Sequence, residues 1–211
     1  MATIAIIGGH GKIGLLTARE LTDAGHTVRS VIRNPEHTAD VTAVGATPVI
    51  LDIEATTPEQ LAAATGPADA LIFTAGAGPD SGPARKETVD HRGAVIALEA
   101  AIALDARFVI VSYLGADTPA TGDDGWVAYQ RAKKAADDAV RTSGADWTIV
   151  RPATLNDEPR TGRVTIDDAL TGGTTSRANT AALLALLATT RPAPHRVLNV
   201  VDGDTPLVDA L

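Results

Sequence analysis

Residues 6–14 read IIGGHGKIG, and this stretch decides the fold. An apolar run, Thr3–Ile7, precedes it, and a helix-like segment follows it. Gly8, Gly11 and Gly14 stand three residues apart. Glycines at this spacing permit a sharp turn out of a strand, a close approach of backbone to a pyrophosphate, and close packing of the helix on the sheet. Because the start of such a helix also attracts anions, the stretch predicts a dinucleotide-binding turn.

The rest of the chain alternates short apolar runs with longer helix-like segments. The runs are nearly continuous in hydrophobicity, which is typical of strands buried on both faces. They are Thr3–Ile7, Thr27–Ile32, Pro48–Leu51, Ala70–Phe73, Phe108–Val111, Thr148–Val150 and Val197–Val201, with predicted helices at 12–24, 36–43, 58–64, 86–104, 126–143 and 177–189. This order predicts an α/β fold in one domain over 1–211: a Rossmann-type doubly wound parallel sheet with helices on both faces.

Two longer segments, 76–86 and 155–176, follow the fourth and the sixth predicted strands. In open α/β sheets, ligands bind at the carboxyl ends of the strands. We therefore expect these two segments to be loops that form a small lid over the substrate. The alternative is that they are surface loops without a special role.

Composition narrows the class of protein. The 211 residues carry a formal net charge of −8 and no cysteine. An acidic surface repels nucleic acid, so we expect a small-molecule substrate and no nucleic-acid partner. No apolar run approaches the roughly 20 residues that cross a membrane. The first predicted strand begins at Thr3, which leaves no room for a signal peptide. We expect a cytoplasmic monomer or homodimer without membrane contact.

Two further residue patterns argue against other kinds of site. The five histidines show no spacing of four, so we expect no metal site. The acid pairs Asp123-Asp124 and Asp137-Asp138 are typical of a solvated surface.

The end of the second predicted strand bears on the choice of dinucleotide. Arg33 follows this strand, and no acid occurs between Asp23 and Glu36. NAD sites use an acid near this point to bind the ribose hydroxyls, whereas a guanidinium pairs with the 2′-phosphate of NADP. Lys12 adds a second positive charge. We expect NADP(H) to be preferred over NAD(H). The alternative is an arginine that ends the strand or stacks on adenine.

Several motifs together resemble a known family. They are GGHGKIG at 8–14, Arg33-Asn34-Pro35, FVIVSYLGAD at 108–117, YQRAKKAAD at 129–137, SGADWTIVRPATL at 143–155, SRANTAALLALL at 176–187 and NVVDGDTPL at 199–207. In this order they resemble the atypical short-chain dehydrogenase/reductases, NmrA-like in their broad grouping. The resemblance covers essentially the whole chain. It is specific for the superfamily and not for a substrate.

The resemblance implies a catalytic set of Ser112, Tyr129 and Lys133. Tyr129 and Lys133 are four residues apart, so on a helix they share one face. Tyr129 is the expected proton donor. Free tyrosine has a pKa of about 10, and we expect the ammonium of Lys133 to lower it. We expect Lys133 also to hold the nicotinamide ribose, and the Ser112 hydroxyl to hold a substrate carbonyl. The alternatives are a packed aromatic side chain at Tyr129, a solvated helix face at Lys133 and a strand-end cap at Ser112.

Tyr113 stands where many relatives have a small hydroxyl residue. Successive side chains on a strand alternate faces. If the chain is still extended there, Ser112 and Tyr113 point in opposite directions. We therefore expect Tyr113 to be a pocket wall or a packing residue.

The expected cofactor contacts lie at the ends of the predicted strands. We expect Asp52 to meet the adenine edge, and the small residues after the fourth strand to let the ribose lie against backbone. The alternative for each is a turn residue that only ends its strand. The full set is Gly8, Gly9, His10, Gly11, Lys12, Ile13, Gly14, Arg33, Asp52, Ile53, Thr74, Ala75, Gly76, Pro152 and Ala153. We expect an NADP(H)-dependent oxidoreductase acting on a small carbonyl, quinone or flavin-like substrate. The alternatives are a non-catalytic NADP(H) sensor and an epimerase or isomerase with bound cofactor.

Overall fold

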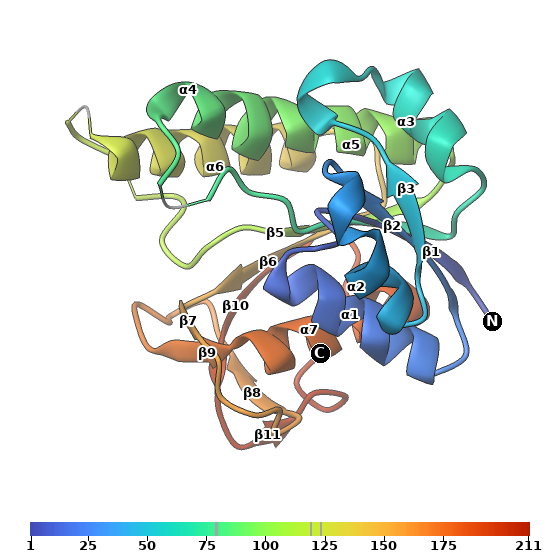
Figure 1. Cartoon of the computed structure of the whole chain (residues 1–211). Helices are drawn as coiled ribbons and strands as arrows, with labels where there is room; N and C mark the ends of the chain where they lie inside the picture. Colours follow the sequence, from blue (N-terminus) through green and yellow to red (C-terminus); the bar gives the residue numbers. More distant parts are fainter. Residues whose placement is uncertain (79, 119, 123) are drawn as a thin grey trace.

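A nine-stranded sheet runs through the centre of the computed structural model, which describes residues 1–78, 80–118, 120–122 and 124–211 (Figure 1). Its strands follow the order β3-β2-β1-β4-β5-β6-β10-β8-β11. They are β1 (Thr3–Ile7), β2 (Thr27–Ile32), β3 (Thr47–Ile50), β4 (Ala70–Phe73), β5 (Arg107–Val111), β6 (Trp147–Pro152), β8 (Arg163–Ile166), β10 (Arg196–Asp202) and β11 (Thr205–Pro206).

The sheet is mostly parallel. Strands β1 to β6 and β10 pair in parallel, whereas β8 pairs antiparallel with both β10 and β11. The direction of winding reverses between β1 and β4, which are neighbours in the sheet. Such a reversal opens a crevice at the carboxyl ends of the strands, where open α/β sheets bind ligands.

Helices cover both faces of the sheet, as a Rossmann-type fold requires. Figure 1 shows α3, α5 and α6 on one side of the sheet and α1, α2 and α7 on the other. The helices are α1 (Lys12–Asp23), α2 (Thr38–Ala43), α3 (Pro58–Thr65), α4 (Pro83–Arg85), α5 (Gly93–Ala103), α6 (Gly125–Thr142) and α7 (Arg177–Thr190), with 3-10 turns at Pro35–His37 and Ile53–Ala55 and a π-helix at Lys86–Arg92.

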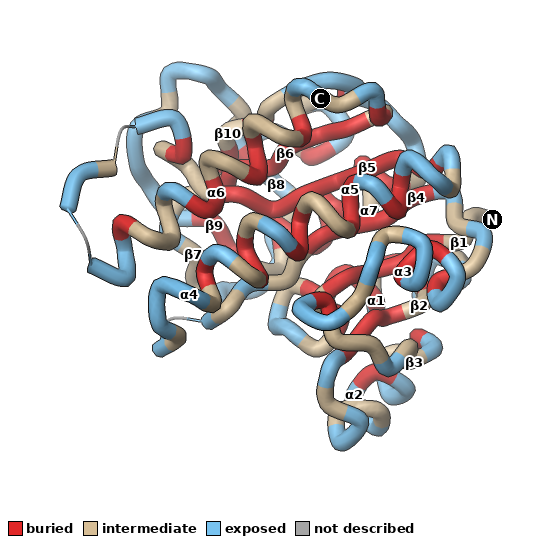
Figure 2. Tube along the Cα trace, turned by 90° about the horizontal axis from the view of Figure 1, so that it is seen from above, coloured by how far each residue is buried: buried red, intermediate tan, exposed pale blue. Residues whose placement is uncertain are grey.

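Alternate side chains of the strands fill two cores, one on each face. Ile6 packs with Leu184 of α7 in one core, and Ile7 packs with Leu98 of α5 in the other. The central strands β1, β2, β4, β5 and β6 are therefore buried along most of their length, whereas the outer sides of the helices are exposed (Figure 2). Strands β3, β8, β10 and β11 are only partly buried. Strand β3 forms one edge of the sheet and contains Pro48, a residue that sheets tolerate at an edge.

All seven predicted strands are present, with ends that differ by at most two residues. The segment 155–176 differs from the prediction of a loop. It contains most of β7 (Thr154–Asn156), all of β8 and β9 (Thr174–Ser176), and β7 and β9 form a separate parallel pair. These strands are short and pair with segments distant in the chain, so local hydrophobicity did not reveal them.

Asn179 fixes this segment to α7. Its buried side chain accepts hydrogen bonds from the backbone N–H groups of Thr161 and Gly162 and donates one to Asp202. Ser176 caps the same helix by accepting from the N–H of Asn179. The segment after β6 is thereby held beside the carboxyl end of the sheet. No helix in the described ranges is long and apolar enough to cross a membrane.

Candidate functional site

The glycine turn between β1 and α1 lies at the reversal point of the sheet. Gly8 has a φ of +86°, and a Cβ there would lie 2.6 Å from the backbone of Ala75. A Cβ on Gly14 would lie 2.5 Å from the carbonyl oxygen of Gly8. Only glycine fits either position, since real side chains do not approach backbone so closely. The turn is also tied to β2 by a hydrogen bond from Gly9 N–H to the carbonyl of Val31.

The first turn of α1 is open to an anion. Among the described residues, none caps this helix with a side chain, and its first turn contains no acid. The helices α3, α6 and α7 are instead capped by Thr57, Asp124 and Ser176. The uncapped N–H groups and the positive dipole end are the groups that bind a pyrophosphate. The exposed Gly11 leaves the approach to them clear. The turn therefore fits a dinucleotide.

A cavity of about 340 Å³ adjoins the glycine turn. Nine of the residues that the sequence predicted for the cofactor line it: Gly8, His10, Gly11, Arg33, Asp52, Ile53, Thr74, Ala75 and Gly76. Gly9 and Gly14 pack inside the turn. Lys12 points elsewhere, because its ammonium binds Asp157 at 2.6 Å.

The charges at the outer end of this first cavity differ from the prediction. The sequence spacing indicated no acid near Arg33, but Glu54 lies 3.3 Å from its guanidinium. Glu54 comes from the turn after β3, so spacing along β2 did not reveal it. Arg85 binds the same carboxylate at 2.6 Å, and Thr88 donates to it. Arg85 foremost, with Thr88 and Arg33, holds the pKa of Glu54 below its usual value.

A second cavity, of about 870 Å³, shares Thr74, Ala75 and Gly76 with the first. The two cavities therefore meet at the end of β4. Ile13, Pro152 and Ala153 line the second cavity and not the first. The predicted catalytic residues Ser112, Tyr129 and Lys133 line it as well. The structure thus brings the predicted catalytic set beside the predicted cofactor site.

Tyr129 and Lys133 lie on one face of α6. Lys133 is buried, and its ammonium donates to the carbonyl of Val111 at 2.5 Å. Burial lowers the pKa of Lys133, and the negative charges of Asp90 and Asp137 partly oppose this shift. The expectation that Lys133 lowers the pKa of Tyr129 is wrong in this structure. Burial raises the pKa of Tyr129, and the carboxylate of Asp90 raises it further.

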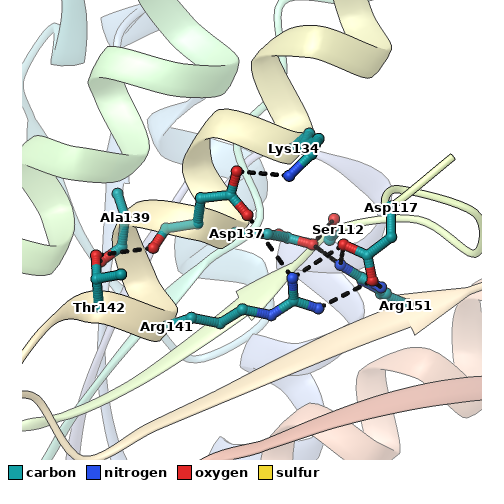
Figure 3. A network of polar contacts seen from close by, with 9 residues as sticks. Ser112, Asp117, Lys134, Asp137, Ala139, Arg141, Thr142 and Arg151 are labelled. Carbon is teal, nitrogen blue, oxygen red and sulfur yellow. Dashed lines mark hydrogen bonds and ion pairs between the residues drawn. The ribbon is translucent and has the colours of Figure 1, made fainter. Parts of the chain in front are cut away.

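Ser112 belongs to a buried network of polar contacts (Figure 3). Its hydroxyl donates to Asp137 at 2.9 Å, and Arg151 donates to the same carboxylate oxygen through two nitrogens at 2.9 and 2.7 Å. Arg151 also pairs with Asp117, which Arg141 binds from the other side. Since a carboxylate only accepts, the Ser112 hydrogen points to Asp137, and its oxygen lone pairs remain for a ligand.

The prediction for the acid pairs is wrong for Asp137, which is fully buried. Asp124 and Asp138 are at the surface as expected, and Asp123 lies outside the described residues. Tyr113 lines the second cavity beside Ser112, because β5 ends at Val111 and the alternation of faces does not continue.

Two buried charged residues of the second cavity were also missed in the sequence. Lys86 and Asp90 line the second cavity from the π-helix Lys86–Arg92, and both are buried. Asp90 accepts a hydrogen bond from the N–H of Ala77, and Lys86 donates to the carbonyl of Gly78. Burial raises the pKa of Asp90, and the positive charge of Lys133 is the main effect that opposes this shift. The segment read as an ordinary helix, whereas π-helical turns are frequent at functional sites.

Comparisons with known proteins agree with this geometry. A family model described as NAD(P)H-binding matches residues 8–191. The Bacillus subtilis protein YhfK, which is named as an uncharacterized sugar epimerase, is 36% identical over 99% of this chain and 98% of its own length. A Bacillus halodurans structure named for an NAD-dependent epimerase/dehydratase superposes with a TM-score of 0.89 at 29% identity, covering 98% of this chain and 97% of that one. The anaerobillin reductase ChuY of Escherichia coli O157:H7 superposes with a TM-score of 0.76 at 25% identity, covering 96% and 98%.

The glycine turn yields a first prediction. Gly11→Val is expected to abolish dinucleotide binding, because its side chain blocks the open end of α1. The fold is expected to survive, since a Cβ there meets only the Gly8 carbonyl at 3.3 Å. Calorimetric titration and circular dichroism measure the two effects. The control is Gly144→Val, where a Cβ meets nothing within 4 Å. Native ellipticity with unchanged affinity would place the pyrophosphate elsewhere.

The network of Asp117 yields a second prediction. Arg151 and then Arg141 hold the pKa of Asp117 well below its usual value. Its contribution to stability is therefore present above the unfolded-state pKa of about 3.9 and is lost as the pH falls towards the folded-state pKa. Because the side chain is half exposed, Asp117→Asn is expected to lower the free energy of unfolding by about 1 kcal/mol at pH 7.

Urea unfolding between pH 7 and pH 3 measures this difference, which is expected to shrink below about pH 4. The exposed Asp168 provides the control variant, Asp168→Asn. If the difference in the free energy of unfolding between the wild type and Asp117→Asn stays constant down to pH 3, the ion pairs of Asp117 do not stabilise the fold.

Proposed function

Because the chain belongs to the NAD(P)H-binding family, we propose that it is an NADP(H)-dependent reductase whose substrate binds in the second cavity. The observation that carries this proposal is the shared wall of Thr74, Ala75 and Gly76. It places a cavity lined by Ser112 and Tyr129 directly beside the cavity that fits the dinucleotide. A carbonyl or quinone oxygen in the second cavity can take a proton from Tyr129. The expectation that Ser112 holds this oxygen is wrong in this structure, because the Ser112 hydroxyl donates to Asp137.

The chain's own residues supply the proton and the alignment. The dihydronicotinamide, when bound, supplies a hydride. Tyr129 would deliver a proton to the substrate oxygen, and solvent would then return a proton to the phenolate. The lone pairs of Ser112 accept a hydrogen bond from the phenol or from the product hydroxyl, because the Ser112 hydrogen is committed to Asp137. Lys133 stays within the second cavity to hold the ribose.

Tyr129 is suited to donate a proton at neutral pH. Burial disfavours the phenolate, so the side chain remains a phenol throughout the neutral range. A phenol is the form that donates a proton to a nascent alkoxide.

The preference for NADP(H) rests on the two arginines of the first cavity. Arg33 and Arg85 both line it, and they share the single carboxylate of Glu54. The three groups together carry one net positive charge, and Asp52 in the same cavity offsets it until a phosphate binds. A 2′-phosphate pairs with Arg33 in the bidentate, charge-assisted manner that guanidinium groups favour.

This preference yields a third prediction. NADPH is expected to bind at least tenfold more tightly than NADH, which corresponds to about 1.4 kcal/mol. Arg33→Ala is expected to remove most of that difference and to leave NADH affinity nearly unchanged. Calorimetric titration of both dinucleotides measures it, with the exposed Arg19→Ala on α1 as the matched control. Equal affinities in the wild type would refute the role of Arg33.

Catalysis yields a fourth prediction. Tyr129→Phe keeps the ring but removes the proton donor, so turnover is expected to fall by about 10²–10⁴-fold with NADPH affinity spared. The substrate is first found by screening quinones, aldehydes and flavins with NADPH. Tyr113→Phe, in the same cavity, is the control and is expected to keep most activity.

Full activity in Tyr129→Phe would reassign the proton to Tyr113 or to solvent. Tight NADPH binding without turnover on the whole panel would favour a sensor over a reductase.

A further inference from the structure

The outer part of the second cavity has an aromatic wall made of Tyr113, Trp126 and Tyr129. The chain contains only six Phe, Trp and Tyr residues, and three of them meet here. The Trp126 and Tyr129 rings are nearly parallel, 27° apart with centroids 5.3 Å from each other. Tyr113 lies 5.4 Å from the Tyr129 ring and 5.8 Å from the Trp126 ring. The three rings therefore pack against one another, and the exposed part of Trp126 is left open to a ligand.

Trp126 is placed where the fold does not need it. Its side chain is 58% exposed, whereas Phe73, Phe108 and Trp147 are in the core. A large exposed aromatic at the rim of a cavity marks a surface that binds something apolar or planar. The proton transfer uses Tyr129 alone and leaves Trp126 without a role. The aromatic wall therefore fits a substrate with a flat conjugated ring system.

A cationic group lines the same cavity. Arg177 begins α7, and its guanidinium binds Asp157 at 2.7 Å. Lys12 binds the other oxygen of Asp157 at 2.6 Å. Two cations thus share one carboxylate, and the cluster is positive within a chain of net charge −8. Lys12 and Arg177 hold the pKa of the Asp157 carboxyl below its usual value, so the group is charged at neutral pH.

Trp126 and Arg177 enclose the cavity from two directions. Trp126 lies in the first turn of α6 and Arg177 in the first turn of α7, and these helices cover opposite faces of the sheet (Figure 1). The cavity at the end of the sheet lies between them. A ring on the aromatic wall can therefore extend a substituent towards Arg177.

We propose that the substrate is a planar conjugated molecule with an anionic substituent, a carboxylate or a phosphate. The ring system stacks on the aromatic wall, and the anion takes the place of Asp157 on the Arg177 guanidinium. Lys12 keeps Asp157 as its partner, so no carboxylate is left unpaired. That this molecule is a substrate rests on the proposed function, but its binding to the cavity is measured without turnover.

The test compares pairs of compounds that share a ring and differ in charge. Protein saturated with NADP⁺ is titrated calorimetrically with FMN against riboflavin, and with anthraquinone-2-carboxylate against its carboxamide. In each pair the anionic member is expected to bind at least tenfold more tightly. Trp126→Leu is expected to weaken the binding of both members of a pair by a similar factor, because the substitution removes stacking and leaves the charges unchanged.

Arg177→Gln is expected to make the affinities for the two members of each pair equal. The matched control is Arg196→Gln, at the opposite, amino end of the sheet, which is expected to keep the preference. Asp157→Asn is expected to strengthen the anionic member several-fold, because it frees Arg177. A misfolded variant does not gain affinity, so this second variant separates a binding role from a structural one.

Equal affinities within both pairs in the wild type, or a preference that persists in Arg177→Gln, would overturn the inference. Turnover is measured separately with NADPH. Selective binding of the anionic members without turnover would refute the proposed reductase and leave the binding site standing.

Discussion

The close approach of Gly8 to Ala75 is the constraint on which the site depends. No Cβ fits between the two backbones, so the end of β1 lies directly against the end of β4. The N–H and the hydroxyl of Thr74 both donate to the carbonyl of Ile7 and fix this contact. The glycine turn therefore adjoins the short segment after β4 that forms the common wall of both cavities.

Around this wall, the buried charged groups Asp137 and Lys133 each lie beside groups of opposite charge. Asp137 lies next to the guanidinium of Arg151, and Lys133 lies among Asp90, Asp137 and a backbone carbonyl. An isolated buried charge is far more costly than a paired one. Arg151 spans from Asp137 to Asp117, and so connects α6 to the segment after β5. Ser112 begins that segment, and its orientation is thus set by the network and not by the strand alone.

Much of the fold was predictable from local pattern. The strands are short, continuous apolar runs, and the glycine spacing of residues 8–14 specifies one turn. The partners of charged residues were not predictable in the same way. Asp137 and Asp138 are neighbours in sequence, but only Asp137 faces the sheet, and that depends on the rotation of α6. Glu54 reaches Arg33 from another strand, and the pairing of β7 with β9 joins residues about twenty apart. These contacts are tertiary, so no window of sequence contains them.

The π-helix Lys86–Arg92 has a consequence for how the site is encoded. An α-helix advances about 100° per residue, and a wider π turn holds one more residue in the same rotation. Removing a single residue from this turn would restore the α-helical register and swing Asp90 away from Lys133 without altering any side chain. Which side chains face the second cavity therefore depends partly on the number of residues in this segment. Two sequences with the same residues in this region, offset by one insertion, would present different groups to the same substrate.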